Sequence, residues 1–370
     1  MKFSTCWLSL LLGLAAMGCS SGSSDGGEWV RLLPVDSDGS YGYGVSAPFI
    51  GTLPDGRAVV AGGCNFPEVP VAEGGTKRYY DDIYVWDTVA EAWRSGGRLP
   101  QALAYGACAS TPEGIFCAGG TDSLGRSTNE AYLLTSDEVK TLASLPDSLD
   151  NCAGVYLEGR CYVVGGRSFY VYDFQSNAWQ AGPLWPRTER RVQPVVVAQA
   201  GRVWLFGGYD PEGAESVFSE GYVYDPATET WRTVAGPVDA EGEPLLAAGG
   251  AGVAWGADSI VCFGGVNAAV FTEALDRAWA LAVAPENDSL RRVQRTYMEQ
   301  EPGWYRFNDR VLIFDTATER WSFSSERAPQ GARAGAGATP MRWGTSPGVL
   351  LFNGELKPGI RTPEVWLWRP

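Results

Sequence analysis

The most consequential feature of this 370-residue chain is an absence, because it contains no histidine. Catalysis by Ser-His-Asp or Cys-His groups is therefore excluded, as are zinc, copper and non-haem iron sites that depend on imidazole ligands. General acid–base chemistry must then be carried by a carboxylate, a lysine, a tyrosine or a cysteine. We accordingly expect no metal site that is built on imidazole ligands.

Positive charge is also scarce, with 29 Lys and Arg against 43 Asp and Glu and a formal net charge of −14. This balance argues against nucleic acid or an anionic membrane surface as a partner. An anionic small molecule would need a local cluster of arginines. The oligomeric state is left open by the composition.

The N-terminal apolar run, Trp7 to Met17, has 11 residues and is far too short to span a bilayer. It ends just before Cys19 and resembles a bacterial lipoprotein signal, with ordinary signal cleavage nearby as the alternative. We predict that residues 1–18 are a signal peptide, that Cys19 is lipidated, and that residues 19–27 form a flexible tether. The protein is then expected in the periplasm or at the cell surface as an outer-membrane lipoprotein, with membrane contact only through its lipid.

Six cysteines remain after the N-terminal segment, and no Cys-x-x-Cys occurs. A domain this large needs no disulfide staples, so we expect most of them to be small buried hydrophobes. Cys108 and Cys117 could face each other across a hairpin that turns at Pro112-Glu113, so a bridge between them is geometrically possible. The six are Cys64, Cys108, Cys117, Cys152, Cys161 and Cys262.

Internal repetition dominates the rest of the chain. Short apolar strands end in a Gly-Gly doublet at Gly62, Gly119, Gly165, Gly207 and Gly264, and a sixth ends in Asn353-Gly354. The spacings of 42 to 89 residues bracket the ~50-residue period of kelch motifs, in which each unit is one four-stranded blade. An aromatic third strand precedes a tryptophan in the pairs Tyr84 and Trp93, Tyr172 and Trp179, Tyr224 and Trp231, and Phe314 and Trp321. The chain thus resembles an all-β, six-bladed kelch-type propeller.

The last repeat stops at its third strand, Val365 to Trp368, with no fourth strand after it. The segment Glu28 to Pro34 resembles the missing strand. Pairing it into the last blade would close the ring and hide two open sheet edges. We therefore predict one domain, residues 28–370, closed by its N-terminal strand.

Insertions follow the doublets at residues 64–81, 121–129, 209–220 and 266–308. They leave equivalent strands at the same end and so share one face, which is typical of a binding surface. The longest, in the fifth blade, carries apolar residues at helical spacing in Ala268–Ala284 and Leu290–Glu301. A helical lid over a pocket and a cap on the rim of the blade are equal alternatives for this insertion.

The segment Asn353 to Thr362, with the sequence Asn-Gly-Glu-Leu-Lys-Pro-Gly-Ile-Arg-Thr, follows the sixth strand on that face. It places Glu355, Lys357 and Arg361 within seven residues. A carboxylate held there among apolar blade walls would have its pKa raised, as a general base at neutral pH requires. Solvated surface charge is the alternative.

This motif resembles the signature of the N-acetylneuraminate epimerases, the kelch-type sialic acid mutarotases of bacteria. Three shorter pieces agree with it: Gly264 to Asn267, Arg191 to Gln193, and Ala104 to Gly106. Because the Glu motif lies in the last blade, the chain is similar to the cyclically permuted branch of that family. A ring has no privileged first blade, so permutation leaves the spatial site intact, while the exact sugar stays open.

The resemblance implies that Glu355 is the proton acceptor and Arg361 its functional partner, acting on a small sugar acid. A guanidinium offers a bidentate fork to the substrate carboxylate, so Arg361 is the first candidate to bind it, followed by Arg191 and Lys357. Candidates for the sugar hydroxyls, each also a candidate loop-capping amide, are Asn65, Asn267 and Gln193.

The implied reaction is interconversion of α- and β-sialate through an open-chain ketone, by carboxylate acid–base catalysis without a cofactor. A non-catalytic glycan- or protein-binding propeller at the cell surface is the alternative, and it predicts that Glu355 is dispensable for binding. A glycosidase or lyase with paired carboxylates would need a second acid beside Glu355, and no second motif supplies one.

Overall fold

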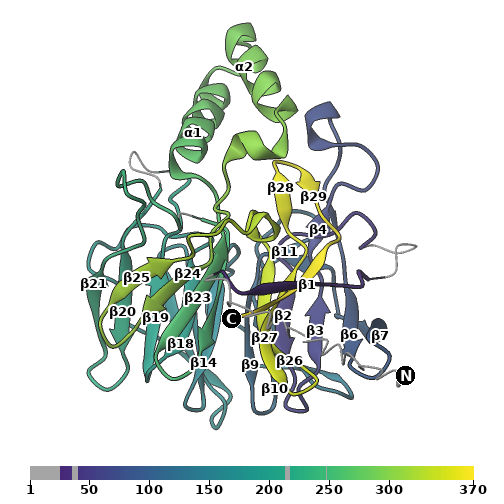
Figure 1. Cartoon of the computed structure of the whole chain (residues 1–370), viewed down its shortest axis with the longest axis vertical. Coiled ribbons are helices and arrows are strands. Elements are labelled where there is room, and N and C mark those ends of the chain that lie inside the picture. Colours follow the sequence, from purple (N-terminus) through teal and green to yellow (C-terminus); the bar gives the residue numbers. More distant parts are fainter. Residues whose placement is uncertain (1–25, 36–40, 213–216, 247) are drawn as a thin grey trace, which may run out of the picture.

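The structure is a computed structural model that describes residues 26–35, 41–212, 217–246 and 248–370. The predicted signal peptide, Cys19 and the tether up to residue 25 lie outside these residues. Six four-stranded antiparallel sheets surround a common axis (Figure 1). Their innermost strands contact one another in sequence around a closed circle, which confirms the six-bladed propeller. Within the described residues, no helix is both long and apolar enough to cross a membrane.

Each blade runs from an inner strand at the axis to an outer strand at the rim. The first three blades consist of β2 (Phe49–Thr52), β3 (Ala58–Ala61), β6 (Asp82–Asp87) and β7 (Ala92–Arg98); β9 (Ala107–Thr111), β10 (Gly114–Ala118), β12 (Ala131–Leu134) and β13 (Val139–Thr141); and β14 (Ala153–Leu157), β15 (Arg160–Gly165), β16 (Ser168–Asp173) and β17 (Ala178–Ala181). The last three consist of β18 (Val195–Gln199), β19 (Arg202–Phe206), β20 (Gly221–Asp225) and β21 (Thr230–Val234); β22 (Gly250–Trp255), β23 (Ser259–Gly264), β24 (Leu312–Asp315) and β25 (Arg320–Phe323); and β26 (Gly337–Trp343), β27 (Ser346–Phe352), β30 (Val365–Arg369) and β1 (Glu28–Leu32).

The N-terminal strand closes the ring, as predicted. β1 pairs antiparallel with β30, from Glu28 opposite Arg369 to Leu32 opposite Val365. Leu32 is buried between the sixth and first blades. The closing strand therefore supplies both backbone partners for β30 and apolar surface for the core.

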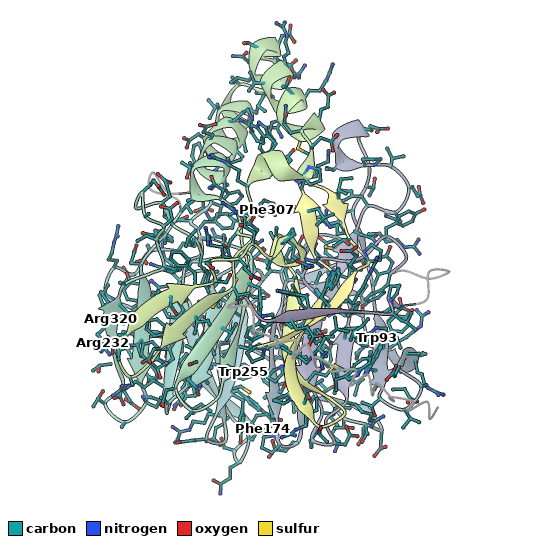
Figure 2. The ribbon with its side chains drawn as sticks, viewed as in Figure 1. Trp93, Phe174, Arg232, Trp255, Phe307 and Arg320 are labelled. Atoms are coloured by element: carbon teal, nitrogen blue, oxygen red, sulfur yellow. The ribbon has the colours of Figure 1, made fainter. Side chains whose placement is uncertain are left out.

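The core consists of six apolar clusters, each between two neighbouring blades. Four outer-strand tryptophans tie neighbouring blades together, because each indole N–H donates to a carbonyl just after the outer strand of the preceding blade. Figure 2 shows one of them, Trp93, at the side of the propeller. The pairs are Trp93 with Leu33 at 3.1 Å, Trp179 with Ala143 at 2.7 Å, Trp231 with Pro183 at 2.8 Å, and Trp321 with Ala235 at 2.9 Å.

The first blade departs from the aromatic pairing expected from the sequence. Trp86, and not Tyr84, lies opposite Trp93, and Tyr84 lies opposite Ser95. Trp86 and Trp93 are seven residues apart, as are the paired aromatic residue and tryptophan of the third, fourth and fifth blades, whereas Tyr84 and Trp93 are nine apart.

In the first, second and fifth blades, the first glycine of the doublet lets the blade approach the segment that enters the next blade. A Cβ on Gly264, whose φ is 64°, would lie 2.1 Å from the carbonyl oxygen of Arg333, and the N–H of Gly265 donates to that same oxygen at 2.9 Å. Gly62 meets the carbonyl of Leu103 in the same way. The crowding that requires glycine therefore comes from the segment entering the next blade.

All six described cysteines after the tether are free thiols. Cys108 and Cys117 do face each other across the β9–β10 hairpin, but the structure contains no bond between them. Cys117 is fully buried among apolar residues, as expected.

The fifth-blade insertion forms two helices, α1 (Ala268–Val283) and α2 (Asp288–Glu299), as the periodicity predicted. They stand above one face of the propeller, over the short ribbon of β28 (Glu355–Lys357) and β29 (Ile360–Arg361) (Figure 1). Figure 2 shows Phe307 between the helices and the propeller. Shorter elements on the chain are β4 (Cys64–Asn65), β5 (Arg78–Tyr79), β8 (Leu103–Ala104), β11 (Thr121–Asp122) and the 3-10 turns η1 (Val71–Glu73), η2 (Pro302–Tyr305) and η3 (Pro329–Gly331).

A ring of backbone hydrogen bonds surrounds the axis where the chain enters the inner strands. One residue from each blade has a left-handed conformation, with φ between 49° and 67°. Five N–H···O bonds of 2.7 to 3.2 Å and one of 3.3 Å, donated by Cys152, link neighbouring blades there. Below this ring the inner strands enclose an axial cavity of about 320 Å³. The ring residues are Ala47, Tyr105, Asn151, Gln193, Gly249 and Gly335.

Candidate functional site

The ten-residue motif folds into the β28–β29 ribbon, which leaves the sixth blade directly after β27. Gly354 has a φ of 106°, which turns the chain out of the blade. Gly359, with a φ of 82°, then reverses the ribbon. A Cβ on Gly359 would lie 2.1 Å from the side chain of Val71, so only glycine fits this turn.

The ribbon brings the acid and the arginine of the motif together. Glu355 lies opposite Arg361 in the register, and Arg361 Nη1 is 2.8 Å from Glu355 Oε2. The backbone of Glu355 is fixed in turn, because its N–H and carbonyl both pair with Ala334, the neighbour of the ring residue Gly335. The motif is therefore a hairpin that holds Glu355 at the edge of the backbone ring.

Protein groups surround Arg361 on several sides. Its Nε donates to Ser46 Oγ at 3.1 Å, and its guanidinium lies over the ring of Phe66 at 5.1 Å. Only 3% of its side chain is exposed. Its Nη1 contacts Glu355 as an ion pair and has no acceptor in hydrogen-bonding geometry among the described residues. One N–H group at the site thus lacks a directed partner.

The electrostatics of the site favour a basic carboxylate. Burial raises the pKa of Glu355 above its ordinary value, whereas Arg361, Lys77 and the N–H of Gly359 act in the opposite direction. Although 24% of the Glu355 side chain is exposed, protein encloses the rest of it. The effect of burial on its pKa is therefore larger than the opposing effects of the cations and the N–H. A carboxylate with a raised pKa binds a proton more readily in mid-pH solution, which suits a general base.

Two residues outside the motif complete the polar cluster. Lys77 Nζ donates to the hydroxyl of Tyr105 at 3.1 Å, and Cys64 Sγ donates to the same oxygen at 3.4 Å. Burial raises the pKa of Tyr105 well above its ordinary value, and Cys64 and Glu355 add to this, while Arg361 opposes it. The phenol therefore stays protonated at neutral pH.

Tyr105 stands in an unfavourable backbone conformation. Its φ of 64° is the highest among the non-glycine residues of the ring, and two of the other five ring positions, Gly249 and Gly335, are glycine. A bulky residue in this region costs on the order of 1–3 kcal/mol. The ring itself needs only backbone groups at this position, so the side chain of Tyr105 is retained for its contacts.

The helical insertion covers this cluster. Lys357 Nζ donates to the carbonyl of Gln300, the residue that caps α2, at 2.7 Å. Burial raises the pKa of Tyr297 to about 12 and also raises that of Tyr305, and the charge of Glu355 contributes to both shifts. Because α2 also contacts η1 and η2 contacts β28, the insertion lies over the site and not merely on the rim of its own blade.

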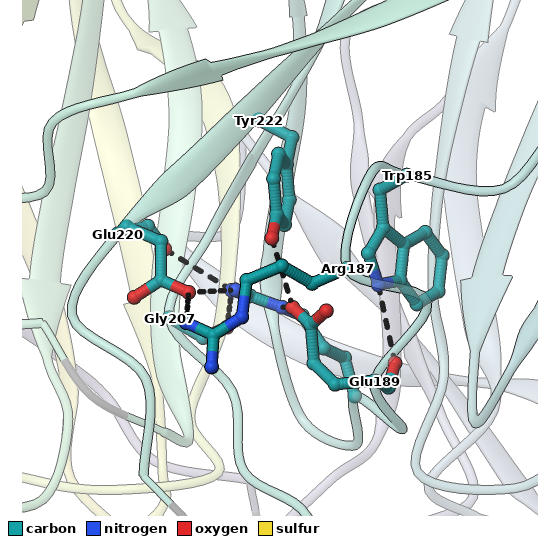
Figure 3. A network of polar contacts seen from close by, with 7 residues as sticks. Trp185, Arg187, Glu189, Gly207, Glu220 and Tyr222 are labelled. Atoms are coloured by element: carbon teal, nitrogen blue, oxygen red, sulfur yellow. Dashed lines mark hydrogen bonds and ion pairs between the residues drawn. The ribbon is translucent and has the colours of Figure 1, made fainter.

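The structure places Arg191, a predicted substrate ligand, inside its own blade and away from solvent. Arg191 is fully buried, and it pairs with Glu189 at 2.6 Å and Glu220 at 2.9 Å. Figure 3 shows Glu189 and Glu220 together with Gly207 and Tyr222. It also donates to the carbonyl of Gly207 at 2.6 Å and lies over the rings of Phe218 and Tyr222.

A second arginine shows that Arg191 belongs to the repeat. Arg333 is buried in the sixth blade, donates to the carbonyl of Asn353 at 2.8 Å and lies 3.6 Å from a carboxylate oxygen of Glu364. Each arginine thus links the first residue of the doublet, Gly207 or Asn353, to the glutamate just before the third strand of the same blade, Glu220 or Glu364. The pattern of an arginine upstream of the doublet and a glutamate downstream of it was visible in the sequence.

The three predicted amides, Asn65, Asn267 and Gln193, each form hydrogen bonds with other protein groups. Asn65 is buried and binds the carbonyl of Gly44 and the hydroxyl of Tyr80. Asn267 caps α1 by accepting from the N–H of Val270 at 3.1 Å. These contacts are those of loop-capping amides, and the substrate role of the two residues stays a prediction.

Gln193 differs from the other two amides because it lies in the backbone ring and lines the axial cavity. Its Nε2 donates to the Asn151 side chain at 2.9 Å. Lys77 and Tyr105 were not predicted to be site residues. Tyr105 was visible within the Ala104 to Gly106 piece, and Lys77 within the first insertion, but nothing in the sequence joined them.

Comparison with known proteins agrees with the geometry. A sequence profile described as N-acetylneuraminate epimerase matches residues 142–369, a span that contains the whole β28–β29 motif. The chain belongs to the N-acetylneuraminate epimerase family. The match begins after the second blade, so Lys77 and Tyr105 lie outside it.

Individual members of the epimerase family show the same partial overlap. A protein of Yersinia enterocolitica named N-acetylneuraminate epimerase is 30% identical over 223 residues, which cover 58% of this chain and 53% of that protein. One from Haemophilus influenzae with the same name is 28% identical and covers 62% and 59%. The chain thus spans little more than half the length of these relatives.

A solved structure shares the architecture. The structure titled "Structure of YjhT" aligns with a TM-score of 0.52 and 24% sequence identity, over 62% of this chain and 65% of that one. At this identity the likeness concerns the fold alone.

Proposed function

We propose that this protein interconverts the α and β anomers of N-acetylneuraminate or a closely related sugar acid. Membership in the epimerase family supports this, and so does the site, where a carboxylate of raised pKa, an arginine and a protonated phenol converge under the helical insertion. The single observation that carries the proposal is the pairing of Glu355 with Arg361 across the motif ribbon.

The reaction needs one proton acceptor and one proton donor. Glu355 takes the proton of the anomeric hydroxyl at C2 while the ring oxygen receives a proton. The bond between C2 and the ring oxygen breaks with its electrons on that oxygen, and C2 becomes a ketone. Rotation about the adjacent bond and closure on the other face give the opposite anomer and return both protons.

Arg361 fixes and tunes Glu355 in this scheme. Its guanidinium holds the carboxylate in place through the 2.8 Å contact and limits how far burial raises the pKa of Glu355. We also assign the substrate carboxylate to the Arg361 guanidinium, because its planar fork matches a carboxylate. Lys357, tied to Gln300, belongs instead to the contact between ribbon and helices.

The test is the time course of anomer equilibration of freshly dissolved N-acetylneuraminate, followed by proton NMR. The parent protein should accelerate it over buffer, and Glu355→Gln should slow it by roughly 10²–10⁴ with little change in sugar affinity. The parent rate should fall as pH drops through the pKa of Glu355, because the protonated carboxyl cannot accept a proton. Since burial raises that pKa, this limb should lie above the range of an exposed carboxylate. A parent protein that gives no acceleration would leave the non-catalytic binding propeller in its place.

We also propose that the protein is a lipoprotein of the cell envelope, on the basis of the sequence ending at Cys19. Mass spectrometry of membrane-extracted protein should find an acylated Cys19 as the first residue. A free Cys19, or cleavage elsewhere, would overturn this.

A further inference from the structure

Anomer interconversion requires a proton donor for the ring oxygen, and the ribbon motif supplies only the acceptor. This donor must carry a proton at neutral pH and lie beside Glu355 and Arg361. Its proton must also be free to point toward a bound sugar. Lys77 and Tyr105 are the described residues that meet these conditions together.

The hydrogen bonds of Tyr105 determine where its proton can point. Its oxygen lies 3.1 Å from Lys77 Nζ and 3.4 Å from Cys64 Sγ. Lys77 donates to the phenol oxygen, and Arg361 also forms a side-chain hydrogen bond with Tyr105, which leaves the phenol's own O–H as the group to be placed. Among the described residues, only the sulfur of Cys64, a weak acceptor, lies within reach of that O–H, and Tyr105 also lines the axial cavity.

The surroundings can accommodate the charge that forms when this proton leaves. Lys77 is in direct contact with the oxygen and lies over the tyrosine ring at 5.0 Å. Arg361 also lies near Tyr105. Burial lowers the pKa of Arg361, but Glu355 and Tyr105 raise it, and the net shift is upward. Two cations thus face a developing phenolate, as electrostatic stabilisation in a dry site requires.

We propose that Tyr105 is the catalytic acid that protonates the ring oxygen, and that Lys77 orients and stabilises it. The inference rests on the proposed function. Tyr105 gives its proton to the ring oxygen as the C2–oxygen bond breaks, while Glu355 takes the proton of the C2 hydroxyl. The phenolate and the protonated Glu355 then return both protons when the ring closes, so the protein ends unchanged.

The same NMR assay tests this, with Tyr105→Phe as the variant and Tyr156→Phe as its matched control. Both variants remove one hydroxyl from residues lining the axial cavity, but Tyr156 lies on β14, away from the Lys77 contact. Tyr105→Phe keeps the ring and the backbone strain, and it should lower kcat by roughly 10²–10⁴ with KM little changed. Tyr156→Phe should equilibrate the sugar like the parent.

Lys77→Met provides a second, independent measurement. If Lys77 supports the acid, kcat falls; if Lys77 only attracts the substrate carboxylate, KM rises with kcat intact, and its assigned role is wrong. Glu355→Gln combined with Tyr105→Phe should be little slower than the slower single variant, because one concerted step uses both groups.

The outcomes separate this inference from the proposed function. A parent protein without acceleration refutes the function itself. An active parent with an equally fast Tyr105→Phe variant, or with fully additive losses in the double variant, overturns the assignment of Tyr105 and leaves the function standing.

Discussion

Replacing Leu32 by alanine should destabilise the whole ring, because this residue belongs to the strand that closes it. Leu32 is 4% exposed and packs between the sixth and first blades. Truncating a buried leucine costs about 2–5 kcal/mol. A domain of this length unfolds with an entropy of about 0.7 kcal/mol/K, so the melting temperature should drop by about 3–7 °C.

Leu33 provides the matched control, because it is the next residue and is 60% exposed. Leu33→Ala keeps the carbonyl that Trp93 binds and removes only exposed surface, so its melting temperature should stay near the parent value. Calorimetry or fluorescence melting of the two variants side by side measures the difference. Equal melting temperatures for both variants would refute the role of β1 in the core.

Deleting residues 26–34 should have a larger effect than the single substitution. It removes the carbonyls of Gly26 and Leu33, which accept the indole N–H groups of Trp368 and Trp93. The buried Trp368 N–H left without a partner costs about 1–3 kcal/mol in addition to the lost apolar surface, whereas the exposed Trp93 N–H can turn to water. The bared edge of β30 should also promote self-association, visible by size-exclusion chromatography. A truncated protein that stays monodisperse and melts like the parent would mean that the ring closes in another way.

Two further predictions concern the arginines. Arg361→Lys keeps the charge but loses the Nε bond to Ser46. Turnover should fall by more than about tenfold, and substrate binding should weaken. Undiminished turnover would contradict the tuning role of Arg361. Arg191→Met should leave two carboxylates, Glu189 and Glu220, without their buried partner. The free energy of unfolding should fall by about 3–5 kcal/mol, and KM should stay unchanged. A raised KM with the melting temperature of the parent would support Arg191 as a substrate ligand.

The first blade shows a limit of pattern reasoning in a repeat. Tyr84 was paired with Trp93 by residue type, but Trp86 lies opposite Trp93 and keeps the seven-residue spacing of the other three pairs. The register of a hairpin is fixed by its turn and loop length, so the spacing along the chain was a better guide than the kind of aromatic residue.

The sequence by itself determined the propeller, its closure by Glu28–Leu32 and the short segment that carries both Glu355 and Arg361, which the structure shows as a ribbon. These features rest on local signals: apolar strands, glycines at positive φ, and a Pro-Gly turn that places two residues of one motif opposite each other. Short-range chain geometry suffices to bring such residues together.

Only the tertiary structure decided which residues from other blades join the site. Arg191 carries the same side chain as Arg361, but burial and two carboxylates commit it to holding its own blade together. Lys77 and Tyr105 come from the first and second blades and reach the Glu355 cluster only because the ring closes. Contacts between residues hundreds of positions apart arise from the curvature of the whole ring, which no local pattern in the chain records.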